Sequence, residues 1–311
     1  MDIPIFIMMV GLVGSGKTAR AQELSEEYNA NVFSSDELRE ELFGDVNHQE
    51  NNDMLFKELH NRIKGCLKDG KNAIYDATNI NYKRRMAFLV ELKNIPCKKI
   101  CVLMATPYKE CLKRNAGRDR NVPEYVIERM YRQFDIPWYY EGWDEIQIEY
   151  SDGAKNYLGH PKSFAINTKD FSQDNPHHKL TLGAHCAKAF NEIEMLYRNN
   201  YSEHAISTCY AASIHDCGKI FTKQFKNSKG EHSDIAHFYN HEKCGSYDSL
   251  FYKLEPFCDQ LYVATLIRWH MQPYFWEKDN NEKSHNKYKK LWGDQLYNDI
   301  MKLHKADKAA H

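Results

Sequence analysis

Residues 11–18 read Gly11-Leu12-Val13-Gly14-Ser15-Gly16-Lys17-Thr18, after an apolar run (3–10) and before a segment with helical spacing (17–28). In this context the pattern G-x-x-x-x-G-K-[ST] forms a phosphate-binding loop, because backbone N–H groups and a helix N-terminus face the phosphate oxygens. A glycine-rich turn without a ligand is the alternative. We expect ATP to be bound by Gly11, Gly14, Ser15, Gly16 and Lys17, and Mg²⁺ to be bound by the Thr18 hydroxyl.

Composition limits the class of protein. The chain has 311 residues, enough for two domains, and a formal net charge of −1. A site for nucleic acid must therefore be a local basic patch rather than a property of the whole surface. The nine cysteines contain no C-x-x-C pair, and no secretory signal or membrane helix precedes the loop, so a cytoplasmic protein with reduced thiols is expected.

Residues 1–150 alternate short apolar runs with amphipathic segments, which predicts an α/β domain with a parallel sheet covered by helices on both faces. Strands are expected at 3–10, 31–34, 72–75, 98–104 and 145–150. Helices are expected at 17–28, 36–42, 51–69, 84–93, 108–115 and 123–134. Ligands of such sheets lie at the carboxyl ends of the strands, so motifs that follow strands should lie near the phosphate loop.

Two such motifs follow the second and third strands. Asp36 and Arg39 lie one helical turn apart, where Asp36 could accept the proton of an attacking hydroxyl and Arg39 could hold an acceptor phosphate. The alternative is that Asp36 only complements the helix dipole. The third strand ends in Asp76, and in many P-loop enzymes an acidic residue at this place supports the metal ion. Thr78 and Asn79, which follow it, are short polar residues suited to binding a substrate. The alternative is an ordinary loop between a strand and a helix.

A basic segment follows the fourth strand. Residues 113–123 contain four cations in eight positions, a glycine and a closing proline, so they cannot form an uninterrupted helix. We interpret them as a lid that brings arginine to the triphosphate, with a solvated charged loop as the alternative.

Together these motifs resemble the phage-type polynucleotide 5′-kinases, a family of P-loop kinases. The resemblance covers nearly all of residues 4–135. It implies that Asp36 is the general base, that Lys17 and Arg118 act on the phosphates, and that the acceptor is bound by Arg39, Thr78, Asn79 and Arg85. The chain departs from that family in two places: Ala77 stands where the family has Asp directly before Thr-Asn, and the lid is about one residue shorter.

The second half has a different character. Thirteen of the fifteen histidines follow residue 150. Residues 151–172 are polar and interrupted by Gly153, Gly159 and Pro161, so they are expected to form a linker between domains at 1–150 and 173–311. Helical spacing at 182–199, 202–215, 241–254 and 258–271 predicts an all-helical second domain.

Polar residues interrupt this helical half at intervals. The small apolar segment 205–214 should be a buried helix that places His215 and Asp216 at the rim of a core, where a carboxylate is costly unless it is paired or bound to metal. Imidazole and carboxylate groups together suit Mn²⁺, Fe²⁺, Co²⁺, Ni²⁺ or Zn²⁺. The histidines interpreted as structural or surface residues are His204, His232, His285 and His311.

This half resembles the HD-type metal phosphohydrolases, in particular the branch fused to tRNA nucleotidyltransferases. The resemblance assigns one metal ion to His185, His215, Asp216 and Asp307. It assigns a second metal ion, or the substrate phosphate, to His241 and His270, and it makes Lys219 and, more weakly, His178 phosphate contacts. Because the printed chain ends four residues after Asp307, the last helix is expected to be short.

A kinase and a phosphohydrolase in one chain could act on the same class of substrate, the two kinds of end that cleaved nucleic acid carries. The hypothesis is a bifunctional end-healing enzyme that phosphorylates 5′-OH ends of RNA or DNA and removes 2′,3′-cyclic or 3′ phosphate, leaving ends that an RNA ligase could join. Two alternatives stay open. One is a kinase of a small hydroxyl compound or nucleoside fused to a nucleotide phosphohydrolase. The other is an ATP-dependent switch that controls an HD effector.

Overall fold

The computed structural model describes residues 3–48, 50–118, 120–198 and 202–311. The chain forms two compact units, and each is described by itself. The first comprises Met1–Met130 and Pro137–Asp152, and the second comprises Tyr131–Ile136 and Gly153–His311. The short segment Tyr131–Ile136, expected within the first domain, belongs to the second unit because the Tyr131 ring packs against Phe221 (centroids 4.9 Å apart) and Tyr247 (5.8 Å).

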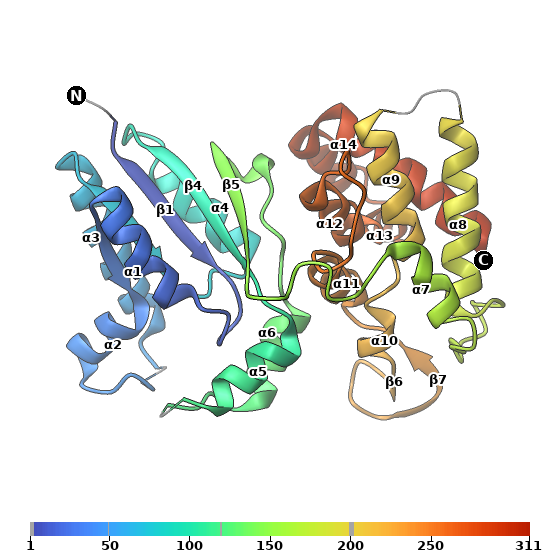
Figure 1. Ribbon diagram of the computed structural model, residues 1–311, viewed down its shortest axis with the longest axis horizontal. Coiled ribbons are helices and arrows are strands. Elements are labelled where there is room, and N and C mark those ends of the chain that lie inside the picture. The colour runs from blue at the N-terminus through green and yellow to red at the C-terminus, as the bar shows by residue number, and fades with distance from the viewer. Residues whose placement is uncertain (1–2, 49, 119, 199–201) are drawn as a thin grey trace. The chain divides into compact units, whose positions relative to one another are not determined.

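The first unit contains a five-stranded sheet in the order β2-β3-β1-β4-β5, in which every neighbouring pair is parallel (Figure 1). This confirms the expected parallel α/β fold of the N-terminal part. The strands are β1 (Ile5–Val10), β2 (Ala30–Ser34), β3 (Asn72–Asp76), β4 (Lys98–Ala105) and β5 (Glu145–Tyr150). The α-helices are α1 (Lys17–Tyr28), α2 (Ser35–Phe43), α3 (Asn52–Lys68), α4 (Tyr82–Glu91), α5 (Tyr108–Ala116) and α6 (Glu124–Arg132), and a 3₁₀ turn covers Tyr139–Glu141.

The central strand β1 is apolar throughout because both of its faces are covered. Side chains alternate along a strand, so Ile7 and Met9 face one side, where they share a cluster with Leu24 of α1. Phe6 faces the other side and makes an edge-to-face contact with Phe88 of α4, with centroids 5.4 Å apart. Helices therefore hold the sheet from both faces and fix the carboxyl ends of its strands.

The second unit is mainly helical. Its helices are α7 (Pro161–Asn167), α8 (Leu182–Tyr197), α9 (Glu203–Ile214), α10 (Lys219–Thr222), α11 (His241–Ser249), α12 (Gln260–Trp269), α13 (Gln272–Asp279) and α14 (Glu282–Ala310). Residue 199, the last of the expected helix 182–199, lies outside the described residues. The helix α9 is buried along most of its length, as its small apolar composition predicts, and it leads directly into His215 and Asp216.

Two expectations for this unit are wrong. It is not all-helical, because β6 (Gln224–Lys226) and β7 (His232–His237) form an antiparallel hairpin. Its last helix is not short either: α14 covers 29 residues as two helical segments that meet at a kink at Gly293 (φ 74°, ψ 170°), and the segment after the kink carries Asp307. The buried carboxylate of Asp299, which accepts hydrogen bonds from the Tyr197 and Tyr262 hydroxyls at 2.7 Å each, ties α14 to α8 and α12.

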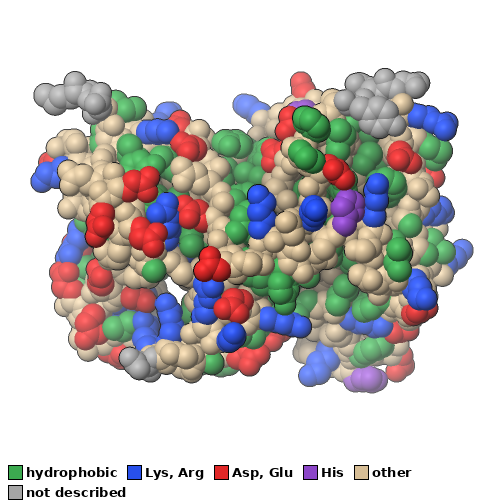
Figure 2. Space-filling view, in the orientation of Figure 1, with side chains coloured by type: hydrophobic (Ala, Val, Ile, Leu, Met, Phe, Trp, Pro, Cys, Tyr) green, Lys and Arg blue, Asp and Glu red, His purple; other side chains and the backbone are tan. Residues whose placement is uncertain are grey.

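Surface charge is mixed. On the face shown in Figure 2, acidic and basic side chains are interspersed, in keeping with the net charge of −1. Within the described part of the chain, no helix has both the length and the apolar character needed to cross a bilayer.

Candidate functional site

The phosphate loop connects β1 to α1. Gly14 and Gly16 adopt left-handed backbone conformations, with φ of 82° and 98°. A Cβ atom at Gly14 would overlap the carbonyl oxygen of Cys111 in α5, so only glycine fits there. Because Gly16 is the N-cap of α1, no capping side chain competes for the first N–H groups of the helix. The loop therefore presents backbone donors where an anion would bind.

Lys17 and Thr18 begin α1 at this point. Lys17 Nζ donates to the Leu12 carbonyl oxygen at 2.7 Å, which folds the side chain back over the loop. Burial lowers the pKa of Lys17, and the nearby Asp76 carboxylate opposes that shift. The Thr18 hydroxyl donates to Asp76 Oδ2 at 2.8 Å. A hydroxyl and a buried carboxylate side by side are oxygen ligands of the kind that Mg²⁺ takes in P-loop enzymes.

Asp36 lies in the first turn of α2. Its Oδ1 is 3.1 Å from Arg39 Nη1, and its side chain remains 60% exposed. Arg39 is buried and donates a second hydrogen bond to Asn52 Oδ1 at 3.0 Å, so the guanidinium is held from both sides. The acidic group is therefore accessible, and the arginine beside it is fixed in position.

The basic segment that was interpreted as a lid contributes a second arginine to Asp36. Arg120 Nη1 lies 3.0 Å from Asp36 Oδ2, while Arg120 Nε donates to Asn47 Oδ1 at 3.1 Å. The sequence predicted Arg118 as the arginine that acts on the ATP phosphates. The charge of Arg118 lies close enough to lower the pKa of Lys17, which places this side chain near the phosphate loop. The two arginines thus lie near different parts of the site.

The loop after β3, which contains Thr78 and Asn79, forms hydrogen bonds with the end of β1 and with the first residue of the phosphate loop. Gly11 N donates to the Thr78 carbonyl oxygen at 3.0 Å, and Asn79 Nδ2 donates to the Met9 carbonyl oxygen at 2.9 Å. Arg85 is fully buried, forms two hydrogen bonds of 2.7 and 2.6 Å with Glu141, and donates to the Asn79 carbonyl oxygen at 2.8 Å. Arg85 was expected to bind the acceptor; the structure gives it a structural role, because its guanidinium is already satisfied by a buried carboxylate.

In the second unit, six side chains from different elements meet in the interior. They come from α8, the end of α9, the start of α11, the end of α12, and α14, and all are buried: His185, His215, Asp216, His241, His270 and Asp307. These are the six residues expected from the resemblance to form a metal site.

Asp216 joins two groups of ligands. Its Oδ2 lies 3.3 Å from His185 Nε2 and 3.5 Å from His215 Nε2. Asp307 Oδ1 lies 3.0 Å from His185 Nε2 and 3.5 Å from His215 Nε2 and completes this group.

The other oxygen of Asp216 faces the second group. Asp216 Oδ1 lies 3.2 Å from His241 Nε2 and 3.6 Å from His270 Nε2. The two histidine nitrogens are themselves 3.3 Å apart. One carboxylate thus faces two groups of histidine nitrogens, and either group together with Asp216 could hold a metal ion.

Backbone carbonyl groups orient three of the histidine rings. His215, His241 and His270 each direct Nδ1 at the carbonyl oxygen three residues earlier, at 2.9, 2.8 and 2.6 Å. A carbonyl can only accept, so Nδ1 carries the hydrogen and Nε2 faces the carboxylates. This is how proteins fix the tautomer of metal-binding histidines.

The residues present fit a divalent transition metal. Ligand atoms separated by 3.0–3.6 Å match the edges of a coordination shell whose bonds are about 2.0–2.2 Å long. Burial would raise the pKa of Asp216, but the charges of Lys219 and His215 hold it well below its usual range. Burial would lower the pKa of His185, but hydrogen bonds to Asp216 and Asp307 outweigh that effect and raise it to about 9.

Lys219 and His178 lie beside this cluster. Lys219 Nζ is 2.7 Å from Asp216 Oδ2, donates to Gln173 Oε1 at 2.8 Å and lies 3.4 Å from His178 Nε2. Burial and the Lys219 charge lower the pKa of His178 to about 3, so this ring is neutral. Its buried Nδ1 has no hydrogen-bond partner among the described residues. Lys219 and His178 thus lie between the cluster and a cavity, whose wall includes both residues.

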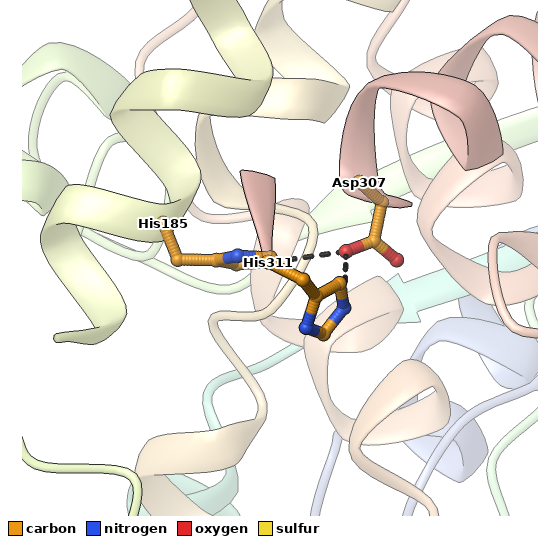
Figure 3. A group of neighbouring side chains, drawn as sticks. All are labelled: His185, Asp307 and His311. Atoms are coloured by element: carbon orange, nitrogen blue, oxygen red, sulfur yellow. Dashed lines mark ion pairs between the residues drawn. The ribbon is translucent and has the colours of Figure 1, made fainter. Parts of the chain in front are cut away.

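Sequence reasoning missed two side chains of this site. His311, interpreted as a surface or structural residue, lies with its Nε2 3.5 Å from Asp307 Oδ1, and Figure 3 shows it beside His185 and Asp307. The Tyr274 hydroxyl donates to Asp307 Oδ2 at 3.1 Å. The spacing of four residues between Asp307 and His311 on one helix was the available signal for His311.

The cluster opens into a cavity of about 960 Å³. Asp216, His241 and Asp307 line its inner part, together with Lys219, His178 and His311. The hairpin residues Gln224 and Lys226, the turn residues Asn227, Ser228 and Gly230, and the aromatic residues Phe238, Tyr239, Tyr274 and Phe275 line the rest. This hairpin wall could not be anticipated, because the unit was expected to be entirely helical.

Comparison with known proteins identifies the N-terminal part. Residues 6–137 match the AAA domain family. The L-seryl-tRNA(Sec) kinase of Methanococcus maripaludis is 26% identical over 145 residues, which are 45% of this chain and 56% of that protein, so the chain spans little more than half the length of this relative.

Two solved structures resemble the chain in part. A chain of the Pnkp1/Rnl/Hen1 RNA repair complex is 24% identical with a TM-score of 0.39, over 43% of this chain and 44% of that one. The APS kinase CysC of Mycobacterium tuberculosis, in complex with AMPPNP and APS, is 16% identical with a TM-score of 0.37, over 48% of this chain and 90% of that one. The parallel sheet and phosphate loop give the N-terminal part of this chain a P-loop kinase fold, and residues 6–137 of it match the AAA domain family.

Proposed function

We propose that this protein is a bifunctional enzyme that heals nucleic-acid ends. Its kinase domain would transfer the γ-phosphoryl group of ATP to a 5′-OH end. Its second unit would act as an HD-type, metal-dependent phosphohydrolase that removes a 2′,3′-cyclic or 3′ phosphate. The observation that carries the proposal is the buried cluster of four histidines and two aspartates around Asp216, in the same chain as a P-loop kinase domain.

The kinase half follows from the loop and from Asp36. Lys17 and the loop N–H groups would hold the ATP phosphates, and Thr18 with Asp76 would hold Mg²⁺, which neutralises phosphate charge. Asp36 would take the proton of the acceptor hydroxyl as its oxygen bonds to the γ-phosphorus and the bond to ADP breaks. The exposure of Asp36 allows this role, and the acceptor would replace Arg120 as its neighbour.

The hydrolase half follows from the second unit. A divalent metal such as Mn²⁺, Ni²⁺, Co²⁺ or Fe²⁺ supplies a hydroxide at neutral pH and neutralises the charge that develops on phosphorus. Lys219, released from Asp216 by the metal charge, would hold a non-bridging phosphate oxygen. The unsatisfied Nδ1–H of His178 would donate to a second phosphate oxygen.

Two observations favour a polynucleotide acceptor over a small hydroxyl compound. The curated relative is named for a substrate that contains a tRNA. Basic side chains also gather along the lid, at Lys113, Arg114, Arg118 and Arg120, where a phosphodiester backbone would be attracted. An RNA ligase is the partner class that would use the healed ends.

The kinase test uses RNA with a 5′-OH and a 2′,3′-cyclic phosphate, incubated with ATP, Mg²⁺ and Mn²⁺ or Ni²⁺. Asp36→Ala should abolish labelling of the 5′ end and leave loss of the cyclic phosphate unchanged. Glu37→Ala removes the neighbouring exposed carboxylate of the same helical turn and should preserve both reactions. Wild-type phosphorylation of a nucleoside or sugar, but not of the RNA, would refute the polynucleotide acceptor.

The hydrolase test uses the same RNA. Asp216→Ala and Asp307→Asn should each abolish loss of the cyclic phosphate and spare 5′ labelling, and the circular dichroism of each variant should match that of the wild type, which shows that the helical second unit has folded. Asp234→Ala, at a fully exposed side chain of β7, is the matched control and should leave both reactions intact. If wild-type protein loaded with metal leaves cyclic and 3′ phosphates untouched, the hydrolase half of the proposal is wrong.

A further inference from the structure

The cavity over the metal cluster has two exposed aromatic rings in its wall. Tyr239 is 38% exposed and Phe275 is 50% exposed, and both line this cavity. They come from different elements: Tyr239 lies in the turn between β7 and α11, and Phe275 lies on α13. Exposed single aromatic residues are common, but two in the wall of one charged cavity indicate a ligand with an apolar face.

Each of the two rings is a close neighbour in sequence of a residue that contacts Asp216 or Asp307. Tyr239 is two residues from His241, whose Nε2 faces Asp216. Phe275 directly follows Tyr274, whose hydroxyl donates to Asp307. Tyr239 and Phe275 also line the same cavity as Asp216 and Asp307, so one ligand in this cavity could contact both the cluster and the rings.

The Tyr239 ring is held in a defined orientation. It stacks on the His237 ring with centroids 5.3 Å apart and an angle of 6° between the planes. A ring that is already supported on one side loses little conformational freedom when a planar group stacks on the other. Flat packing of this kind favours a planar ligand over a flexible aliphatic chain.

Polar, charged and apolar side chains make up the remaining wall, with Glu242 and Met271 among them. Lys226 of β6 and the turn residues Asn227 and Ser228 line the cavity together with the two rings. Its volume of about 960 Å³ falls at the upper end of the about 300–1,000 Å³ typical of pockets for small ligands. The two rings could stack on a base, the hydrogen-bonding groups could contact a sugar, and the Lys226 cation could contact a flanking phosphate.

From these observations, and resting on the proposed hydrolase function, we propose that Tyr239 and Phe275 form a stacking site for the terminal nucleobase of the strand whose phosphate is removed. The substrate class is thus a nucleotide end with a base, not a sugar phosphate alone. Stacking recognises any base because every base has an aromatic face, so the site selects for a nucleotide without reading sequence.

The test compares two short RNAs that differ only in the terminal nucleotide, which carries adenine in one and no base in the other. Both end in a 3′ phosphate and carry a 5′ fluorescein that blocks the kinase acceptor end. Fluorescence anisotropy with the full chain should show about tenfold tighter binding of the RNA with the base. Tyr239→Ala and Phe275→Ala should each remove most of this preference, and Tyr239→Trp should retain it.

Phe257→Ala is the matched control, because Phe257 is 76% exposed in the same unit and does not line the cavity. It should leave the preference for the base unchanged. In removal of the terminal phosphate, Tyr239→Ala should raise KM for the RNA with the base and leave kcat unchanged. Equal binding of the two RNAs by the wild type, or an equal loss in Phe257→Ala, would overturn the stacking site. A clear preference without hydrolysis would refute the proposed function and leave the stacking site standing.

Discussion

Asp248 in α11 carries a carboxyl group that makes the second unit sensitive to pH. Burial raises the pKa of Asp248 to about 7, although a hydrogen bond from Tyr131 opposes the shift. In the unfolded chain this carboxyl titrates near pH 4. Because the folded state keeps its proton up to about pH 7, the unfolding free energy falls as pH rises from about 4 to about 7 and levels off above.

Asp248→Asn removes this titration. The variant should therefore lose less unfolding free energy than the wild type between pH 5 and pH 8. Urea unfolding at the two pH values measures the difference, and Asp234→Asn, at an exposed carboxylate, serves as the control. Identical losses in Asp248→Asn and the wild type would show that the raised pKa does not exist.

Gly218 allows the backbone that carries His241 to approach. A Cβ atom at this position would overlap the carbonyl oxygen of His241 and crowd Gly245 N. Gly218→Ala should therefore displace His241 from Asp216 and destabilise the fold by about 1–3 kcal/mol. Calorimetric titration with Mn²⁺ should show weaker binding, whereas Ile220→Ala, at an exposed position of α10, should bind Mn²⁺ like the wild type. Unchanged Mn²⁺ affinity in Gly218→Ala would contradict the close packing.

At the scale of single elements, α3 contains a glycine that no contact requires. A Cβ atom at Gly65 would meet open space, and the residue lies within the helix with ordinary φ. Alanine restricts the unfolded chain more than glycine does, so Gly65→Ala should raise the unfolding free energy by about 0.5–1 kcal/mol. Urea unfolding measures it. Gly70→Ala, where φ is 73°, should instead destabilise the fold, and stabilisation by both variants would contradict the backbone argument.

The sequence predicted those elements whose stability comes from a buried face. The expected strand 98–104 lies within β4, where six of the eight residues are buried, and the expected helix 17–28 coincides with α1. The hairpin was missed because it buries little: Phe225 and Ile235 are 40% and 37% exposed, so its alternation has no apolar side. Contacts distant in sequence hold it, such as Ala236 N donating to the Asp174 carbonyl oxygen at 2.8 Å, and no local pattern reports them.

At the scale of the whole molecule, a site could be predicted from the sequence when its residues are close together in the chain, and not when they are far apart. The phosphate loop is a local pattern, so its strand, turn and helix could be predicted together. Asp216 and Asp307 are brought together only by the packing of α9 and α14, and family resemblance rather than spacing related them. For Arg85, closeness in sequence was misleading. Its position just after Thr78 and Asn79 suggested that it binds the acceptor, but its guanidinium is paired with Glu141, which lies far away in the sequence.

Each site is built within one unit, which predicts where ligands protect the chain. The residues around the phosphate loop all lie before Asp152, and those around Asp216 all lie after Gly153. Ligand present at about 100 times its Kd slows opening of the bound region by up to about 100-fold. In hydrogen–deuterium exchange, ATP with Mg²⁺ should protect peptides over 11–18 and 72–79, and Mn²⁺ should protect peptides over 182–190, 210–220 and 303–310. In the sample that contains Mn²⁺ without ATP or Mg²⁺, EDTA should reverse the protection that Mn²⁺ gives. Protection of 182–190 by ATP and Mg²⁺ as strong as that by Mn²⁺ would contradict the separate sites, because a ligand stabilises first the groups it contacts.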